Sequence, residues 1–437
     1  MVELNAAQKE ALESDAQNVV ITAPAGSGKT LCLISAVIEY RHKHLDEVID
    51  VITYTRAATT ELRDRLAEQH VLDVNISTIH VWARERLKEL AVMYGFEVKV
   101  LEQEDIMLIL RQLIERAHAT KMKPEILYSY VTGNKKMDVS DGYAQTLDYL
   151  DRMYIAYKRN NGLYDFTDYP LYLLTMLKKY NEKIANTDAL FVDELQDVDD
   201  EQRQLFELVC ARKKFYIGDA WQAIYFFRGA DSGIFDSLDD FKRYKLTVNY
   251  RSFQEILDYA DTFYIQLRER IGQRGLKVSD IDYRLPSGTA CERGKGGKVY
   301  LTNFWGQTCE IGQAKTNECL PDIFGNTGHN NAPQNTEVDT YKAGCDIMSG
   351  NYFILCRTNK QVKGIQDLGF SNVSTVHQAK GLEYDNVLMV DIEAKDNEDL
   401  NIAYVAATRA RNKLMVMNYN MMYKFLVLYR NNKNELI

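Results

Sequence analysis

The feature that most constrains this chain is a glycine-rich loop between an apolar run and a helix-forming run. Residues 18–21 are apolar, the loop has the sequence Ala23-Pro24-Ala25-Gly26-Ser27-Gly28-Lys29-Thr30, and residues 31–40 favour a helix. Glycines let backbone N–H groups turn inward around phosphate oxygens at the positive end of the helix. The pattern therefore predicts a phosphate-binding α/β domain, with Ala23 in place of the usual first glycine.

The residue types of this loop predict separate roles. Lys29 is expected to bridge the β- and γ-phosphates of a nucleotide, and Thr30 to hold Mg²⁺. A chance match in an ordinary loop is the alternative, and the flanking strand and helix patterns disfavour it. The residues expected to contact the nucleotide here are Ala25, Gly26, Ser27, Gly28, Lys29 and Thr30.

Short apolar runs predict two parallel sheets. Most of these runs are apolar throughout rather than alternating, as expected for strands covered on both faces. One group lies before residue 220 and the other after residue 350; the runs are residues 18–21, 48–54, 189–192 and 214–217, then 352–356, 387–390 and 414–417.

Two interruptions complete the predicted domain organisation. Residues 83–180 have apolar positions at helical spacing and predict a helical insertion, whereas residues 306–350 predict an irregular insertion. The first α/β domain is then expected to comprise residues 1–82 and 181–235, and the second residues 236–305 and 351–437.

Two adjacent carboxylates follow the third apolar run. Asp193 and Glu194 would lie at the carboxyl edge of a parallel strand, where ligands bind in open α/β sheets. We expect Asp193 to hold Mg²⁺ and Glu194 to activate water, because phosphoryl transfer needs charge neutralisation and an oriented nucleophile. The alternative is a solvated acidic turn, which is the interpretation for the acids at 199–201.

Composition narrows the class of protein and of partner. The 437 residues carry a net charge of −9, so a nucleic-acid partner would need a local basic groove. No run is long and apolar enough for a membrane span, and a cytoplasmic protein is expected. The seven cysteines are scattered and predict free thiols; zinc ligation by Cys309, Cys319, His329 and Cys345 is the less favoured alternative.

With these motifs in place, the chain resembles the UvrD/Rep/PcrA group of superfamily 1 DNA helicases almost end to end. The similarity implies two RecA-like parallel-sheet motor domains of the P-loop NTPase class, with a helical insertion in the first. Besides the phosphate loop and the 193–197 acids, the matching segments are residues 4–8, 54–65, 77–80, 218–230, 246–252, 375–384 and 404–411.

The resemblance also implies roles in ATP binding and hydrolysis. Gln8 would hydrogen-bond adenine, Tyr250 would stack on it, and Glu383 would meet the ribose. Gln222 would sense the γ-phosphate. Arg251 and Arg409 would act as arginine fingers from the second domain, so that hydrolysis follows closure of the two domains on ATP.

For DNA, the resemblance implies a single-strand track of aromatic and polar side chains. Aromatic stacking is implied for Tyr54, Tyr225 and Phe227. A buried structural role is the alternative for Tyr54, Phe227 and His80. The implied backbone contacts are Thr55, Arg56, Thr78, His80, Arg228 and His377.

This sequence departs from the family pattern at four places. Arg56 and Ala57 stand where Asn-Lys is usual, which moves one cationic contact, and Leu31 stands where many members have an adenine-packing Arg. Only residues 360–374 occupy the place of a large accessory helical subdomain, so that subdomain is expected to be absent. The sequence ends soon after Arg411, and we expect no nuclease domain.

The expected function is an ATP- and Mg²⁺-dependent helicase that moves 3′ to 5′ on single-stranded DNA and unwinds duplex at junctions. Two alternatives stay open: a translocase without autonomous unwinding, and an ATP-gated DNA-binding subunit of a larger complex. The expected partners are single-stranded DNA, junctions, and a nuclease or a replication or recombination factor. The chain alone is expected to be monomeric.

Overall fold

The computed structural model describes residues 4–132, 141–224, 232–273, 290–302, 308–310, 351–392, 397–418 and 422. The chain forms two compact units. Unit 1 comprises Met1–Ile21, Lys29–Gly218 and Tyr225–Tyr244, and unit 2 comprises Thr22–Gly28, Asp219–Ile224 and Lys245–Ile437. The phosphate loop up to Gly28 and the segment 219–224 thus pack with unit 2, while Lys29 and the 193–194 carboxylates belong to unit 1.

A six-stranded sheet forms the centre of unit 1. Its order is β3-β2-β4-β5-β1-β6, and the pairs β2/β3, β2/β4 and β4/β5 are parallel. The four central strands are the apolar runs of the sequence, as burial on both faces requires. The bounds are β1 Asn18–Thr22, β2 Ile49–Thr53, β3 Asn75–Thr78, β4 Ala189–Val192, β5 Lys213–Gly218 and β6 Lys242–Lys245.

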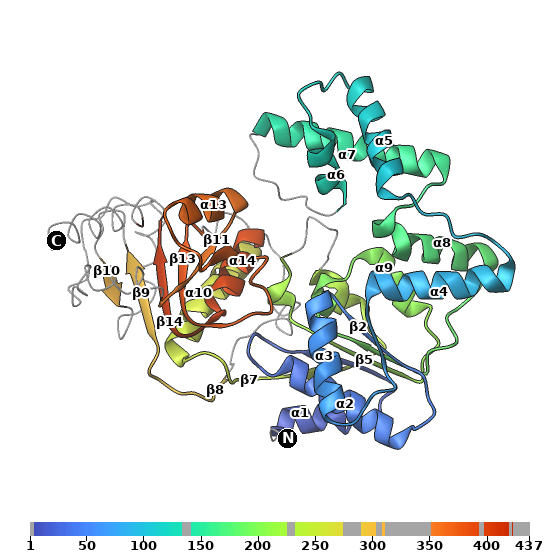
Figure 1. The fold of residues 1–437 in the computed structure, drawn as a ribbon. Coiled ribbons are helices and arrows are strands. Elements are labelled where there is room, and N and C mark those ends of the chain that lie inside the picture. The colour runs from blue at the N-terminus through green and yellow to red at the C-terminus, as the bar shows by residue number, and fades with distance from the viewer. Residues whose placement is uncertain are drawn as a thin grey trace. The chain divides into compact units, whose positions relative to one another are not determined.

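Helices cover both faces of this sheet (Figure 1). On one face, the Tyr40 ring of α2 meets Phe191 edge-on. On the other, Trp82 of α4 packs against Phe206 of α9. The bounds are α1 Ala6–Leu12, α2 Lys29–Lys43, α3 Arg56–Glu68, α4 Ile79–Tyr94, α8 Tyr169–Tyr180 and α9 Asp200–Glu207, with the 3₁₀ turns η1 Phe166–Asp168, η2 Leu195–Asp197 and η5 Ser232–Ser237.

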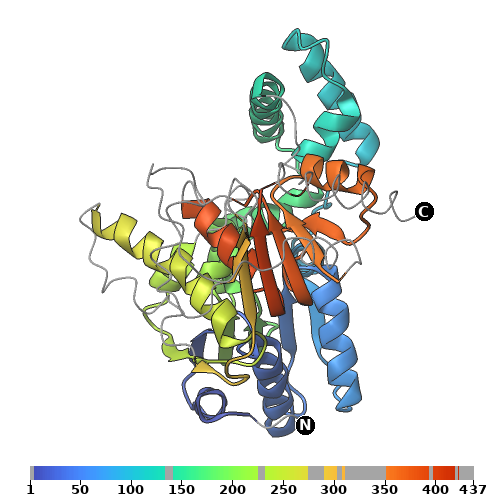
Figure 2. The same ribbon diagram turned by 90° about the vertical axis from the view of Figure 1, so that its left-hand side faces the viewer.

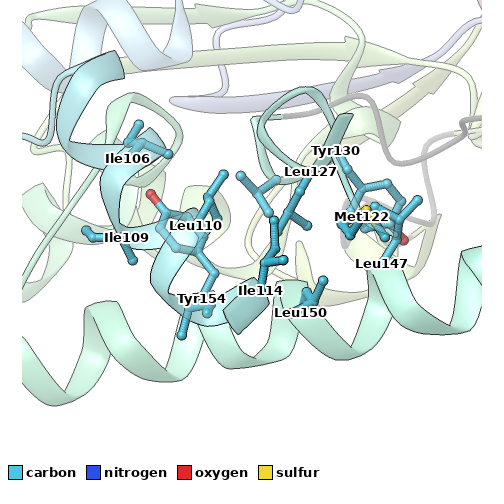
Figure 3. Close-up of a cluster of buried hydrophobic side chains, with 12 residues drawn as sticks. Ile106, Ile109, Leu110, Ile114, Met122, Leu127, Tyr130, Leu147, Leu150 and Tyr154 are labelled. Atoms are coloured by element: carbon cyan, nitrogen blue, oxygen red, sulfur yellow. The ribbon is translucent and has the colours of Figure 1, made fainter. Parts of the chain in front are cut away.

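Three further helices of unit 1 form a separate hydrophobic cluster: α5 Gln103–Arg116, α6 Pro124–Val131 and α7 Asp141–Asn161. Apolar residues at helical spacing bury one face of α5. Pro124 stands in the first turn of α6, where a missing N–H costs nothing. Leu110, Leu127 and Leu150, one from each helix, are fully buried in this cluster (Figure 3).

Unit 2 contains a second six-stranded sheet, in the order β10-β9-β14-β13-β11-β12. All neighbours are parallel except β10, which pairs antiparallel with β9. The short strands β7 and β8 pair separately. The bounds are β7 Val248–Asn249, β8 Ala290–Cys291, β9 Lys298–Thr302, β10 Thr308–Glu310, β11 Phe353–Cys356, β12 Val373–Thr375, β13 Tyr384–Val390 and β14 Ala410–Met417.

Helices lie on both sides of this second sheet, with α10 and α14 on one side and α13 on the other (Figure 2). Ile365 of α13 is buried among side chains from one face of the strands. The bounds are α10 Gln254–Gln273, α13 Asn359–Asp367 and α14 Asn397–Ala407, with the 3₁₀ turn η3 Ala220–Gln222.

The predicted fold class is confirmed: two parallel-sheet α/β bodies, one of which carries an added helical cluster. Between β11 and β12 the chain forms only α13, so no large helical subdomain stands there. The predicted irregular insertion at 306–350 lies outside the described residues except for β10.

The packing of α5 generates a stability prediction. Leu110→Ala should lower the free energy of unfolding by about 2–5 kcal/mol, because it leaves a cavity at a fully buried position. Leu108→Ala on the same helix is the matched control, since its side chain is 57% exposed, and should change stability by less than about 0.5 kcal/mol. Urea unfolding followed by circular dichroism measures both; equal losses would show that the cluster is not a packed core.

Candidate nucleotide and DNA site

The phosphate loop is held by the segment that follows β7, within unit 2. Asn249 Nδ2 donates to the Ala25 carbonyl at 2.6 Å, and the Tyr250 N–H donates to the Gly26 carbonyl at 2.8 Å. Gly26 has φ +70°, and a Cβ there would lie 2.6 Å from the Arg251 Cβ. Only glycine fits this position, because a side chain meets both a left-handed backbone and a close neighbour.

The two predicted carboxylates of unit 1 follow β4 directly. Asp193 is 8% exposed, and burial, followed by the neighbouring charge of Glu194, raises the pKa of Asp193 to about 7. Lys29 Nζ lies 3.7 Å from Glu194 Oε2, so α2 begins beside the end of β4. Thr30 is the next residue of that helix. A carboxylate and a hydroxyl are hard oxygen ligands, and Mg²⁺ commonly takes one or two such protein ligands plus substrate phosphates.

Predicted catalytic side chains also meet within unit 2. Arg409 is 1% exposed, and its Nη2 donates to Gln222 Oε1 at 3.2 Å. The same guanidinium donates to the Val405 and Leu382 carbonyls, which fix its direction. A predicted arginine finger and the predicted γ-phosphate sensor therefore contact each other.

Arg251 and Glu383, predicted to serve the γ-phosphate and the ribose, form an ion pair in unit 2. The Arg251 Nε donates to Glu383 Oε2 at 2.6 Å, and its Nη1 donates to the Thr408 carbonyl at 3.3 Å. Arg411 Nη1 approaches Glu383 Oε1 at 3.7 Å. Glu383 thus pairs with two arginines. A ribose hydroxyl bound there would donate to carboxylate oxygens that already pair with these arginines.

Tyr404 is a contact of this region that sequence reasoning did not single out. It lies on α14, is 3% exposed, and its ring meets the Trp221 ring edge-on at 5.8 Å. Burial raises the pKa of Tyr404 well above its ordinary value, opposed in part by a backbone hydrogen bond from Ala25. The segment 404–411 did match a family motif, but only the packing shows that this aromatic reaches the phosphate loop.

Four of the predicted DNA residues line one groove of unit 1. The groove has a volume of about 880 Å³ and includes Tyr54, Arg56, Thr78 and His80 in its walls. Tyr54 and Arg56 follow β2, Thr78 is the last residue of β3 and His80 follows it; the carboxyl ends of these neighbouring parallel strands share one edge of the sheet. Thr55 does not line this groove; its side chain caps α3 by accepting from the Ala58 N–H at 3.1 Å.

Phe166 is the groove residue that sequence reasoning missed. Its side chain is 47% exposed, and its ring stacks on His80 with centroids 5.6 Å apart and planes 14° apart. Tyr169 contacts Phe166 edge-on at 5.9 Å. The sequence feature that could have identified it is an aromatic residue between two acids, Asp165 and Asp168, inside a segment predicted to be helical.

The remaining predicted site residues lie apart or are not described. Gln8 of unit 1 is buried, and its Oε1 accepts from the Asn5 N–H at 2.9 Å in a capping box. His377 Nε2 lies 3.1 Å from the Ile224 carbonyl oxygen in unit 2. Tyr225, Phe227 and Arg228 lie outside the described residues.

In the described part of the chain, no three His, Cys, Asp or Glu side chains converge as a metal cluster would require. The side chains of the four residues named for zinc lie outside this part. Cys32, Cys210, Cys291 and Cys356 form no disulfide. Nor does any described helix combine the length and apolar character needed to cross a bilayer.

A glycine-rich phosphate loop with carboxylates at the end of a parallel strand defines the P-loop class of nucleotide-binding proteins. The family model of the UvrD/REP helicase N-terminal domain matches residues 4–242, and the UvrD-like helicase C-terminal domain matches residues 370–417. The chain therefore belongs to the UvrD/Rep helicase family.

Curated relatives agree with this membership. The chain is 24% identical to Gabija protein GajB of Bacillus cereus strain VD045, over 95% of this chain and 96% of that protein. It is 29% identical to the ATP-dependent DNA helicase Rep of Buchnera aphidicola subsp. Acyrthosiphon pisum, over 59% of this chain and 44% of Rep. For PcrA of Leuconostoc citreum the identity is 27%, over 62% and 40%. The match thus spans less than half of Rep and of PcrA, but nearly all of GajB.

The close packing at Gly26 leads to a second prediction. Gly26→Ala should destabilise the protein by about 1–3 kcal/mol more than Gly95→Ala, because both glycines have positive φ but only Gly26 faces neighbouring atoms. Urea unfolding midpoints of the two variants measure the difference. Equal midpoints would mean that the loop does not pack against Arg251 as described.

Proposed function

We propose that this protein is an ATP-driven motor that moves 3′ to 5′ on single-stranded DNA and separates duplex at a junction. The observation that carries the proposal is the groove of unit 1, because four residues named from the family's DNA motifs line it together. The family membership supplies the ATP-dependent DNA helicase class. We propose the cytoplasm as the site of action, which agrees with a DNA substrate and with the lack of a disulfide among the four described cysteines.

In the proposed reaction, the residues of unit 1 hold the phosphates and direct water. The Lys29 ammonium neutralises the β- and γ-phosphates. Lys29 Nζ lies 3.7 Å from Glu194 Oε2, so the phosphates compete with Glu194 for the ammonium. Glu194 then accepts a proton from the attacking water. Thr30 and Asp193 would hold Mg²⁺, which when bound neutralises phosphate charge.

Residues of unit 2 complete the proposed ATP contacts. Arg409 and Arg251 stabilise charge that develops on the γ-phosphate, and Gln222 senses whether that phosphate is present. The Arg409–Gln222 hydrogen bond supports this assignment, since one guanidinium links the proposed sensor to Val405 of α14. Tyr250 and Gln8 are proposed to contact adenine, and Glu383 the ribose.

For DNA, we propose that bases stack on aromatic rings of the groove while polar groups contact phosphates. Phe166 and Tyr54 are the stacking residues that the described groove offers. The proposed backbone contacts are Thr55, Arg56, Thr78, His80 and His377. Tyr225, Phe227 and Arg228 are assigned to the same track from their motif alone.

The proposed base gives a kinetic prediction. Glu194→Gln should lower ATP turnover at least 100-fold while ATP affinity changes little, because it removes the proton acceptor and keeps the side chain's size. Lys29→Ala should lose turnover and ATP affinity together. Steady-state phosphate release and binding of a fluorescent ATP analogue measure the two effects; near-normal turnover by Glu194→Gln would require another base.

The proposed motor gives a second functional prediction. Single-stranded DNA should raise ATP turnover at least tenfold, because a motor hydrolyses ATP as it steps, and a 3′-tailed duplex should be unwound in preference to a 5′-tailed or blunt one. Phosphate release and strand separation on the three duplexes measure this. Unwinding of the 5′-tailed duplex alone would reverse the polarity, and ATP turnover indifferent to DNA would favour an ATP-gated binding subunit.

A subunit of a larger complex is the second candidate function. Only α13 stands between β11 and β12, where the family's accessory helical subdomain was expected to be missing. GajB is matched over 96% of its length, whereas Rep is matched over 44%. If a nuclease or another partner controls the motor, the isolated protein should hydrolyse ATP on DNA but unwind only after that partner is added.

A further inference from the structure

A buried cluster of charges forms part of the wall of the proposed DNA groove and has no part in the proposed ATP chemistry. Lys158 of α7 is 7% exposed, and its Nζ lies 2.8 Å from Asp165 Oδ2 and 2.6 Å from Asp168 Oδ2. The Tyr154 hydroxyl also donates to Asp165 Oδ2, at 2.9 Å. Burying an ammonium costs several kcal/mol unless partners compensate it, so such a cluster is expected where it fixes a conformation.

The two carboxylates of this cluster define the turn η1. Asp165 Oδ1 accepts from the Thr167 N–H at 2.8 Å and from the Thr167 hydroxyl at 2.6 Å. Asp168 Oδ2 accepts from the Asp165 N–H at 2.7 Å. The two acids thus form a capping box at the start of η1, and Lys158 pairs with both. Burial and the charge of Asp165 raise the pKa of Asp168, which agrees with one cation serving two acids.

Phe166 lies between the two acids and points the other way. Asp165 is 1% exposed, whereas Phe166 is 47% exposed and stacks on His80. An aromatic ring held half in solvent at a groove offers a face to a nucleobase. Phe166 is the first residue of η1, so the direction of its ring depends on the conformation of that turn.

We propose that Lys158 is a positioning residue for single-stranded DNA. By neutralising Asp165 and Asp168 it fixes η1, and η1 holds the Phe166 ring beside His80 where a base stacks. The inference rests on the proposed DNA-binding function. It also assigns α7, a helix of the added helical cluster, to the DNA site through a buried side chain in the wall of the groove.

The test compares DNA affinity with ATP chemistry in the full chain. Lys158→Met keeps the length of the side chain and removes its charge. The concentration of oligo(dT) that half-saturates ATP turnover should rise about tenfold, the loss of one stacked base, while DNA-independent turnover and the KM for ATP stay unchanged. Lys158→Arg should restore most of the affinity. Lys88→Met, at an exposed lysine of α4 paired with Glu85, is the matched control and should behave as wild type.

A double-mutant cycle separates positioning from a general structural role. Phe166→Ala should weaken DNA binding as much as Lys158→Met, and the double variant should be no weaker than either, because both remove the same contact. Fluorescence anisotropy of labelled oligo(dT) without ATP provides an independent readout. Additive losses, or unchanged affinity in folded Lys158→Met, would overturn the inference.

An unfolded Lys158→Met variant and a wild-type protein that does not bind DNA each call for a different conclusion. If circular dichroism shows Lys158→Met to be unfolded, Thr167→Val replaces it, since this change removes one hydroxyl donor to Asp165 and leaves every charge in place. Thr167→Val should then weaken DNA binding about threefold, and no change would count against the proposal. If the wild-type protein neither binds oligo(dT) nor is stimulated by it, the proposed function itself fails. A failure of the Lys158 inference alone would leave wild-type binding and stimulation intact.

Discussion

Two adjacent carboxylates that share one lysine at the end of β4 impose the main electrostatic constraint on this protein. Asp193 is buried beside Glu194, and Lys29 is 3.7 Å from the latter. Burial and the neighbouring acid raise the pKa of Asp193 to about 7, so the ionised pair lacks positive charge. In the proposed function, Mg²⁺ and the arginines proposed to contact the γ-phosphate supply this charge.

The geometry of Glu194 also has a structural cost. Its backbone is left-handed, with φ 51° and ψ 47°, a conformation that a non-glycine residue adopts only when its surroundings fix it. Gln196 supplies that support, since its buried Nε2 donates to Glu194 Oε2 at 2.6 Å. A Cβ on Gly218 would lie 2.6 Å from Gln196 Oε1. The direction of the proposed base therefore depends on a glycine at the end of β5.

The sequence predicted most of this architecture because buried parallel strands and phosphate loops have local signatures. β1, β2, β4 and β5 are apolar runs, and the acids and glycines stand at their ends. β3 was missed because, of its four residues, only Ile76 is buried. Phe166 and Tyr404 were missed for another reason: their roles come from His80 and Ala25, which are distant in sequence, so no local pattern could reveal them.

The order β3-β2-β4 places the groove residues and the two carboxylates at one edge of the sheet in unit 1. Tyr54 and Thr78 follow β2 and β3 and line the groove, while Asp193 follows β4 at the same edge. The chain continues from Asp193 through η2 to Asp197 and Asp199, which also line the groove. A short, mostly buried segment therefore joins the carboxylates to the groove. If DNA binds this groove as proposed, a base or phosphate that displaces the segment would change the position of Glu194, so coupling between the two sites would need no longer path.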